Sequence, residues 1–427
     1  MTYSGQLTGS AETICVGTEL LLGDILNSNA QYLAQQLAQL GITHHYQTVV
    51  GDNPLRLARA IAIACERARL IIFTGGLGPT PDDITTATIA DFFEVPLVEN
   101  AEVLADITAK FAQRDRAMSA NNRKQALLPK GADVLPNPRG TAPGILWQPR
   151  PGLCLMTFPG VPRELHTMWE TTAVSYLQNQ GWSNGVIHSH TLKFWGVSES
   201  GLAAKVDSFL QLENPTVAPY ASDGVIKLRI SAKATSVVEA ETLMPPVVTQ
   251  LKTIGGIDCF GENDDTLGDA VGRLLLAHHA TLAVAESCTG GGLGATITAP
   301  SGSSAYFMGG IISYDNAVKE RLLGVLPEAL ASHGAVSAVV AEQMAAGVRL
   351  RLATDWGISI TGIAGPGGGS PQKPVGLVFI GLANQTDTWH IECRFGQRKS
   401  REWIRLMSRN TALDLLRRAL LSHANAV

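Results

Sequence analysis

The N-terminal part of the chain alternates between short apolar runs and helix-like segments, and this alternation constrains the fold most strongly. The strand-like runs are Thr13–Val16, His44–Val50 and Leu70–Phe73. Between them, Asn29–Leu40 and Pro54–Ala68 carry apolar residues at helical spacing. Such alternation predicts an α/β fold with a parallel sheet and helices on both faces. Ligands of these sheets bind outside the carboxyl ends of the strands, so the residues after each run are candidates for a site.

Polar and glycine-rich residues follow two of these predicted strands. The first is followed by Gly17-Thr18-Glu19, Asn27 and Asn29, and the third by Thr74-Gly75-Gly76-Leu77-Gly78-Pro79-Thr80-Pro81-Asp82-Asp83. Glycine backbone can approach a phosphate closely. Adjacent carboxylates beside phosphates commonly hold Mg²⁺-type ions through oxygen ligands. Asp82 and Asp83 could equally cap a helix that begins near Ile84, and spacing alone leaves both interpretations open.

The stretch with the most reactive side chains lies far downstream, at Ala285–Gly294. It follows an apolar run, Thr281–Ala285, that is typical of a buried strand, and it places Ser287 and Cys288 side by side before three consecutive glycines. A helix pattern follows, so the glycine N–H groups are expected at a helix N-terminus, where negative charge is favoured. The stretch predicts the nucleophile loop of an acyl-transfer or amide-hydrolysing site. The plainer alternative is a tight strand-to-helix turn.

A nucleophile of this kind needs a neighbouring base. A Ser-His-Asp site requires a histidine, but the histidines of this part of the chain fit surface, packing or capping positions better. They are His278, His279, His333, His390 and His423. A lysine base is the other option, and the same part of the chain contains only Lys319, Lys373 and Lys399.

Lys319 is the favoured lysine because it lies just after a predicted strand, near Tyr314, in a helix that Asn316 could cap. The tyrosine hydroxyl could relay a proton. A lysine acts as a base only if burial or nearby positive charge lowers its pKa. A solvated Lys319, paired with Glu320 or Asp315, stays an open alternative at this point.

The middle of the chain has the pattern of a small α+β unit. Its predicted strands are Thr191–Trp195 and Ile226–Ser231, and its predicted helices are Glu199–Leu210 and Val237–Leu251. The polar, turn-rich run Gly261–Asp265 is predicted as a linker. The last part of the chain again alternates strands and helices. We therefore predict three domains, over residues 1–172, 173–258 and 259–427.

Composition excludes several classes of protein. The net charge of −4 gives no electrostatic basis for binding nucleic acid. The six cysteines are scattered singly, without a C-x-x-C pair, so a zinc site or a disulfide scaffold is not expected. The sequence has neither a signal-peptide pattern nor an apolar run of roughly 18 residues. We expect a soluble, cytoplasmic protein that does not bind membranes.

Several long motifs follow one another along the chain. In the N-terminal part they are Val16–Gly23, Thr74–Asp83, Gly140–Gly144 and Phe158–Pro162. In the C-terminal part they are Ala285–Gly292, Gly302–Ala305, Tyr314 with Lys319, His333–Ser337, Thr361–Pro366 and Lys373–Gly376. Together these motifs resemble those of the CinA family. The resemblance implies a molybdopterin-binding-like α/β domain, a small KH-like α+β domain and a C-terminal nicotinamide-nucleotide amidase domain.

For the N-terminal domain, the resemblance implies a metal-dependent ADP-ribose pyrophosphatase activity, with Asp82 and Asp83 at a divalent ion of unknown identity. The residues that it implies for nucleotide binding are Thr18, Glu19, Asn27, Asn29, Thr74, Gly75, Gly76 and Thr80. The middle segment lacks the Gly-x-x-Gly loop that clamps RNA. A spacer or dimerisation module, in a homodimer expected from the family, is therefore favoured over RNA binding.

For the C-terminal domain, the resemblance implies the hydrolysis of nicotinamide mononucleotide to nicotinate mononucleotide and ammonia without a cofactor. Ser287 is the implied nucleophile, with Lys319 as base and Tyr314 as proton relay. N–H groups of the glycine loop could stabilise the oxyanion. The implied substrate-binding residues are Thr289, Gly290, Gly291, Thr361, Gly362, Ala364, Gly365, Arg398 and Arg401.

Two alternatives stay open. A cysteine-dependent amidase would use Cys288, since a thiol is the intrinsically better nucleophile. A non-catalytic nucleotide-binding protein, accessory to DNA uptake or repair, would use neither residue.

Overall fold

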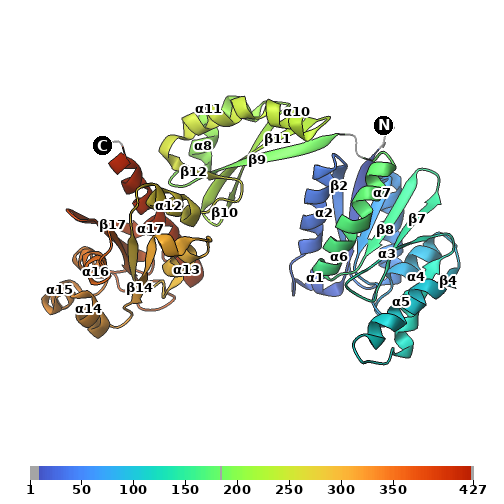
Figure 1. Cartoon of the computed structure of the whole chain (residues 1–427), viewed down its shortest axis with the longest axis horizontal. Helices are drawn as coiled ribbons and strands as arrows, with labels where there is room; N and C mark the ends of the chain where they lie inside the picture. Colours follow the sequence, from blue (N-terminus) through green and yellow to red (C-terminus); the bar gives the residue numbers. More distant parts are fainter. Residues whose placement is uncertain (1–8, 183–184, 425–427) are drawn as a thin grey trace. The chain divides into compact units, whose positions relative to one another are not determined.

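The computed structural model describes residues 9–182 and 185–424, which form two compact units (Figure 1). The first unit contains the residues up to His188 together with Ala232–Leu243. The second contains Ser189–Ser231 together with the residues from Met244 onward. Both units mix helices and strands, which confirms the predicted α/β class. In the described part of the chain, no helix is long and apolar enough to span a membrane.

A six-stranded sheet in the order β2-β1-β3-β8-β7-β6 organises the first unit. Its strands are β1 (Ser10–Val16), β2 (Thr43–Val50), β3 (Leu70–Thr74), β6 (Asp133–Leu135), β7 (Gly144–Arg150) and β8 (Leu153–Phe158). The strands β2, β1, β3 and β8 run parallel, whereas β7 is antiparallel to both of its neighbours. The prediction of a parallel sheet is therefore confirmed for β2, β1, β3 and β8, and it is wrong for the pairings of β7 with β8 and β6.

Helices cover both faces of this sheet, as the alternation predicts (Figure 1). They are α1 (Thr18–Leu22), α2 (Ser28–Gln39), α3 (Pro54–Arg67), α4 (Thr85–Phe92), α5 (Ala101–Ala112), α6 (Pro162–Met168) and α7 (Val174–Asn179); the short strands β4 (Leu97–Glu99) and β5 (Leu127–Pro129) pair apart from the main sheet. Leu70 and Ile72 of β3 pack in one apolar cluster with α2, α6 and α7. Ile71 and Phe73 pack in a second cluster with α3 and α4. Successive side chains of a strand point to opposite faces, so a continuous apolar run predicts this two-sided burial.

A five-stranded sheet in the order β14-β13-β15-β16-β17 organises the C-terminal part of the second unit. Its strands are β13 (Leu282–Glu286), β14 (Phe307–Ile312), β15 (Trp356–Gly362), β16 (Leu377–Ala383) and β17 (Thr388–Arg394). The helices around it are α12 (Leu267–Ala277), α13 (Gly292–Thr298), α14 (Asn316–Leu323), α15 (Pro327–His333), α16 (Ala338–Arg351) and α17 (Arg401–Ala424). Because β14, β13 and β15 run parallel, their carboxyl ends meet at one edge of the sheet.

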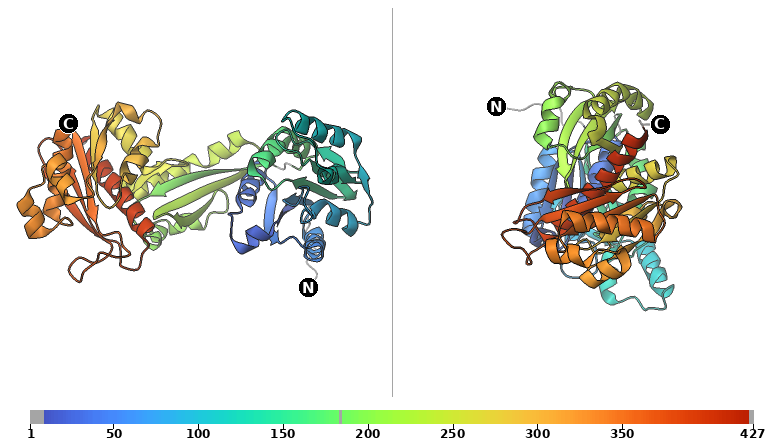
Figure 2. Two further views of the ribbon diagram at one scale, coloured as in Figure 1. Left: turned by 90° about the horizontal axis from the view of Figure 1, so that it is seen from below. Right: turned by 90° about the vertical axis from the view of Figure 1, so that its left-hand side faces the viewer.

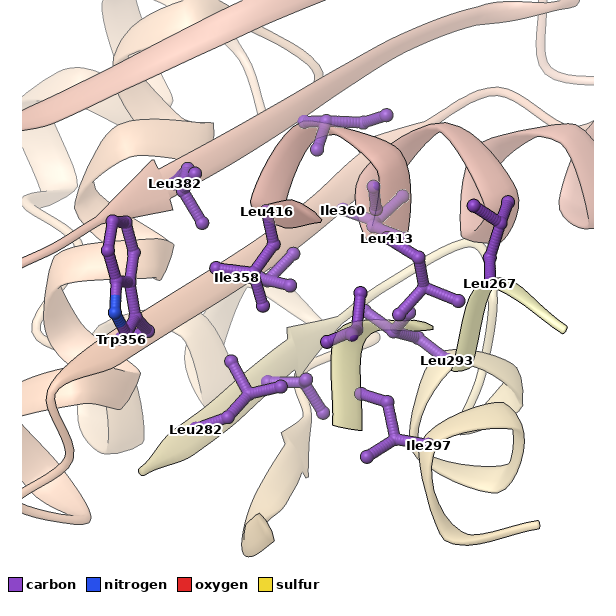
Figure 3. Packing of buried hydrophobic residues seen from close by; sticks show 14 of the residues in the cluster. Leu267, Leu282, Leu293, Ile297, Trp356, Ile358, Ile360, Leu382, Leu413 and Leu416 are labelled. Carbon is purple, nitrogen blue, oxygen red and sulfur yellow. The ribbon is translucent and has the colours of Figure 1, made fainter. Parts of the chain in front are cut away.

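The central strand β13 is buried on both faces. Leu282 and Val284 pack with α12 and α17 in the largest apolar cluster, part of which Figure 3 shows. Ala283 and Ala285 pack against α16 on the other face. Figures 1 and 2 show α17, in red, alongside this sheet. The rigid strand holds its next residue, Ser287, at the edge where the parallel strands end.

A smaller sheet in the order β10-β11-β9-β12 corrects part of the sequence interpretation. Its strands are β9 (Val186–Phe194), β10 (Thr216–Ser222), β11 (Val225–Ala234) and β12 (Cys259–Glu262). The predicted linker Gly261–Asp265 is wrong at its start, because β12 pairs with β9 up to Glu262. Such a short strand is specified by its partner more than by its own sequence.

Both helices predicted in the middle segment are interrupted. The first divides into α8 (Glu199–Lys205) and α9 (Asp207–Leu210), and the second into α10 (Val237–Leu243) and α11 (Pro245–Gly255). The second break has a clear cause, since two consecutive prolines begin α11 and proline lacks the N–H that an unbroken helix needs.

Candidate functional site

Ser287 and Lys319 lie together at the carboxyl edge of the five-stranded sheet. Ser287 directly follows β13, and Lys319 belongs to α14, which follows the neighbouring parallel strand β14. The Lys319 Nζ atom is 3.4 Å from the Ser287 Oγ atom. Lys319 Nζ also donates to the backbone carbonyls of Ser313, at 2.6 Å, and Tyr314, at 3.3 Å. The parallel strands thus bring together two residues that are far apart in the sequence.

Lys319 is buried, with only 1% of its surface exposed. Burial lowers the pKa of its ammonium group, and the Asp315 carboxylate opposes this shift. The alternative of a solvated Lys319 is therefore wrong. The helix cap also differs from the prediction: Asp315, not Asn316, caps α14, and its carboxylate accepts from the Ala317 N–H at 2.8 Å.

No described histidine replaces Lys319 as the partner of Ser287. Within residues 9–182 and 185–424, the hydrogen bond to Ser287 Oγ comes from Lys319. The His390 ring instead contacts the Glu342 carboxylate at 2.7 Å. The side chain of His423 lies outside the described residues.

Glu286, the last residue of β13, accepts hydrogen bonds from N–H groups that we expected to face the substrate. Its carboxylate is 1% exposed and accepts N–H hydrogen bonds from Gly291 and Leu293, both at 3.0 Å, and from Gly294, at 2.8 Å. The negative charge favoured at the start of α13 is therefore supplied by the chain itself. The pattern Glu-Ser-Cys-Thr-Gly-Gly-Gly contained a signal for this contact, because an acid precedes a run of flexible N–H donors.

The expectation that the glycine N–H groups face the substrate is wrong for this loop. Gly290 donates to the Ser287 carbonyl and Gly292 to the Thr289 carbonyl, both at 3.1 Å. Glu286 takes the N–H of Gly291. Among the loop residues of the described chain, Cys288 and Thr289 have N–H groups that no other residue accepts.

Cys288 lies beside Ser287 but points into the protein interior. It is 6% exposed and belongs to the large apolar cluster. Burial raises the pKa of its thiol to about 12, so the thiol is protonated near neutral pH. Because the thiolate is the reactive form of cysteine, the environment favours Ser287 as the nucleophile.

Tyr314 lies at the site through its backbone, while its side chain is 64% exposed. Its hydroxyl accepts from Arg401 Nη2 at 3.3 Å, and Arg401 Nη1 donates to the Gly365 carbonyl at 2.8 Å. Among the described side chains, no hydrogen bond joins the Tyr314 hydroxyl to Ser287 or Lys319. A proton relay through this hydroxyl stays a prediction, and Arg401 links Tyr314 to the loop after β15.

The other predicted substrate residues have varied surroundings. Thr361 is buried and donates to the Ala335 carbonyl at 2.8 Å, whereas Arg398 is exposed. The Thr289 hydroxyl is buried without a hydrogen-bond partner. Its carbonyl accepts from Arg405 at 2.7 Å, a residue not predicted for the site. Gly362, Ala364 and Gly365 form the start of the same loop after β15.

A second candidate site is a cleft of about 520 Å³ in the first unit. Most residues predicted there line it: Glu19, Asn27, Asn29, Thr74, Gly75, Gly76, Asp82 and Asp83. Thr18 and Thr80 do not line this cleft; Thr18 instead accepts from and donates to Asp52. Asn29 is buried and donates to Thr74 and to the Gly160 carbonyl, leaving its own carbonyl oxygen without a partner.

Asp82 and Asp83 lie on the loop before α4 and do not cap it. Asp83 accepts from the Thr80 N–H at 2.9 Å, and Ile84 occupies the cap position of α4. Within the described residues, no group of three ligating side chains could hold a metal by itself. Mg²⁺ commonly uses one or two carboxylates and completes its shell with water and substrate phosphates, so the pair fits such an ion only together with a phosphorylated ligand.

Three family models match successive parts of the chain. A probable molybdopterin binding domain matches residues 12–179, a damage-inducible protein CinA KH domain matches 189–261, and a CinA C-terminal domain matches 264–420. These matches confirm the molybdopterin-binding-like and KH-like domains and identify the third as a CinA C-terminal domain. The domain bounds 1–172, 173–258 and 259–427 stay predictions.

Similar proteins cover nearly the whole chain. A CinA-like protein of Nostoc punctiforme is 65% identical over 97% of this chain and 100% of its own length. One of Cyanothece sp. is 64% identical over 97% of this chain and 99% of its own length. A solved structure, the competence/damage inducible protein CihA from Agrobacterium tumefaciens, is 38% identical over 36% of this chain and 96% of that one, with a TM-score of 0.35. The match of all three domain models, in order, and this identity over almost the full length show that the chain belongs to the CinA family.

Proposed function

We propose that the C-terminal part of this protein hydrolyses nicotinamide mononucleotide to nicotinate mononucleotide and ammonia. The observation that carries the proposal is the Lys319 amine, buried and 3.4 Å from the Ser287 hydroxyl. A serine becomes a strong nucleophile only beside a base, and burial favours the neutral form of lysine that can act as one. The family resemblance supplies the substrate, which this geometry does not select.

Lys319 Nζ donates three hydrogen bonds, to the carbonyls of Ser313 and Tyr314 and to Ser287 Oγ, and loss of one proton would convert the third donor into a lone pair. A neutral amine has two N–H donors and one lone pair. The carbonyls of Ser313 and Tyr314 would still accept the two N–H groups, and the lone pair would then face Ser287 Oγ, 3.4 Å away. Lys319 can therefore take the serine proton as Ser287 Oγ bonds to the carboxamide carbon.

In the remaining steps Lys319 gives up the proton that it took and later transfers another. The tetrahedral intermediate collapses as its C–N bond breaks, and Lys319 returns the proton to the departing nitrogen, which leaves as ammonia. Water then cleaves the Ser287 ester, and its proton passes through Lys319 to Ser287 Oγ. The N–H groups of Cys288 and Thr289 are the loop donors left for the oxyanion. One such donor is worth about 10²–10³-fold in kcat in other acyl-transfer enzymes.

The proposal predicts equal amounts of ammonia and nicotinate mononucleotide when the full-length protein is incubated with nicotinamide mononucleotide. Enzymatic ammonia detection and chromatography of the nucleotides measure the two products. Free nicotinamide serves as the matched control, because it carries the same carboxamide without ribose or phosphate. Consumption of neither compound would favour the non-catalytic, nucleotide-binding accessory role.

The cleft of the first unit supports a second candidate activity, metal-dependent hydrolysis of ADP-ribose. Glycine backbone at Gly75–Gly78 and the carboxylates of Asp82 and Asp83 line the same space. These carboxylates would hold a divalent ion, which would neutralise diphosphate charge and activate water when bound. The resemblance again supplies the substrate.

Asp82→Asn and Asp83→Asn should each lower ADP-ribose hydrolysis in the presence of Mg²⁺ or Mn²⁺. We expect a loss of at least roughly 10-fold, since even outer partners of metal ligands cost 10–100-fold in other enzymes. A chelator should abolish the reaction, and ammonia release from nicotinamide mononucleotide should not change. Asp91→Asn, at an exposed carboxylate of α4, is the matched control. Undiminished hydrolysis in both variants would exclude these residues as ligands.

A further inference from the structure

Glu286 is a buried carboxylate without a role in the hydrolysis described above. Burying a carboxylate is costly unless hydrogen bonds satisfy it. The three N–H groups of Gly291, Leu293 and Gly294 satisfy this one, at 2.8–3.0 Å. Gly291 directly precedes α13, and Leu293 and Gly294 lie in its first turn. The contacts of Glu286 therefore fix the end of the loop that carries the candidate nucleophile and the first turn of α13.

The loop needs such support because its backbone is unusual. Gly290 and Gly291 have φ angles of +56° and +92°, in the left-handed region. Glycine adopts this region freely, but it also loses the most conformational freedom on folding. On the other side, the Ser287 N–H donates to the Ile360 carbonyl of β15 at 3.0 Å. Ser287 is thus held between β15 and a turn closed by Glu286.

Helix α17 adds charge behind the same loop. A Cβ atom at Gly292 would lie only 3.0 Å from Arg409 Cδ, so this side chain packs directly on the turn. Burial and the neighbouring Arg405 lower the pKa of Arg409, and Glu286 opposes both effects. Arg409 therefore offers Glu286 compensating positive charge without a direct ion pair.

We propose that Glu286 is a positioning residue, which fixes the glycine turn so that Ser287 Oγ faces Lys319 and the N–H groups of Cys288 and Thr289 stay free. The role rests on Ser287 as the nucleophile of the proposed amidase. Because Glu286 already occupies these three N–H donors, the phosphate of the substrate must bind to other groups.

The test measures the reactivity of Ser287 without the proposed substrate. A sulfonyl fluoride bonds its sulfur to an activated serine Oγ, with loss of fluoride and the serine proton, and mass spectrometry follows the rate. Glu286→Ala should slow labelling of Ser287 about 100-fold, the typical cost of a 1 Å misplacement. Glu286→Gln keeps one carbonyl oxygen as an acceptor and should lose less. Ser287→Ala shows the background.

Asp355→Asn is the matched control. Asp355 accepts from the N–H and hydroxyl of Thr281, each at 2.8 Å, at the opposite end of β13. This variant should label at the wild-type rate. If nicotinamide mononucleotide is hydrolysed, the Glu286 variants should lower kcat and leave KM unchanged. Here kcat is calculated per folded protein, because loss of folded protein alone also lowers the apparent kcat at constant KM.

Three results would overturn the role. Folded Glu286→Ala protein, verified by circular dichroism, could label as fast as wild type. Wild-type Ser287 could resist labelling altogether. If the variants fail to fold, amide hydrogen exchange of the wild type decides, and unprotected N–H groups at Gly291, Leu293 and Gly294 would contradict the contacts. Labelling without ammonia release would instead refute the proposed substrate and leave the role of Glu286 intact.

Discussion

Lys319→Met will reduce ammonia release from nicotinamide mononucleotide by about 10²–10⁴-fold, the usual contribution of general acid–base catalysis. Methionine has nearly the length of lysine but no basic nitrogen. Ser287 would keep its place after β13 and lose the group that takes its proton. Because Lys319 is 1% exposed, an apolar replacement also removes the cost of burying a charged or polar amine. We therefore expect kcat to fall without a loss of thermal stability.

Lys399→Met is the control for Lys319→Met. The Lys399 amine lies 4.8 Å from the centre of the Trp403 ring, so its removal also eliminates a cationic side chain of the same domain. Steady-state kinetics at several substrate concentrations would separate kcat from KM. Equal activity of Lys319→Met and wild type would exclude Lys319 as the base.

Ser287→Ala and Cys288→Ala, assayed side by side, should have opposite outcomes. Ser287→Ala removes the atom that bonds to the carboxamide carbon, and we expect a loss of at least ~10³-fold, as for a nucleophile that acts with its base as a unit. Cys288→Ala removes a buried thiol with a pKa of about 12. Its activity should stay within an order of magnitude of wild type, with a modest loss of stability from the cavity.

The same pair decides between the two amidase mechanisms. Activity lost in Cys288→Ala and kept in Ser287→Ala would establish a cysteine enzyme. Thermal unfolding of both variants is the necessary control, since Cys288 packs in the largest apolar cluster and a poorly folded variant would mimic a catalytic loss.

The sequence pattern was enough to predict the main layers. It made Ser287 and Lys319 candidates, and the resemblance to the CinA family selected them as a pair. A short apolar run such as Leu70–Phe73 fits few structures other than a strand buried on both faces. Parallel strands bring their following loops to one edge, so a reactive serine and a scarce lysine after neighbouring strands were sound candidates.

Contacts that depend on tertiary packing were not predictable in this way. Glu286 was adjacent to the predicted nucleophile, yet only the fold shows that it takes the N–H groups of the glycine turn. The predicted linker included Gly261 and Glu262, the last two residues of β12, because a strand of four residues carries too little periodicity to outweigh its turn-forming neighbours. Arg405 reaches the Thr289 carbonyl from α17, 116 residues away in sequence, and no local pattern indicates that contact.

The pH dependence of kcat/KM for nicotinamide mononucleotide tests the central claim, that neutral Lys319 activates Ser287, most directly. A general base works only when deprotonated, so activity should be low in acid and rise through the pKa of Lys319. Burial places that pKa below its ordinary value, about 10.4, and the profile should level off above it. The inflection should be absent from the residual activity of Lys319→Met. A rise that continues toward the Cys288 pKa of about 12, or an unchanged inflection in Lys319→Met, would contradict the account.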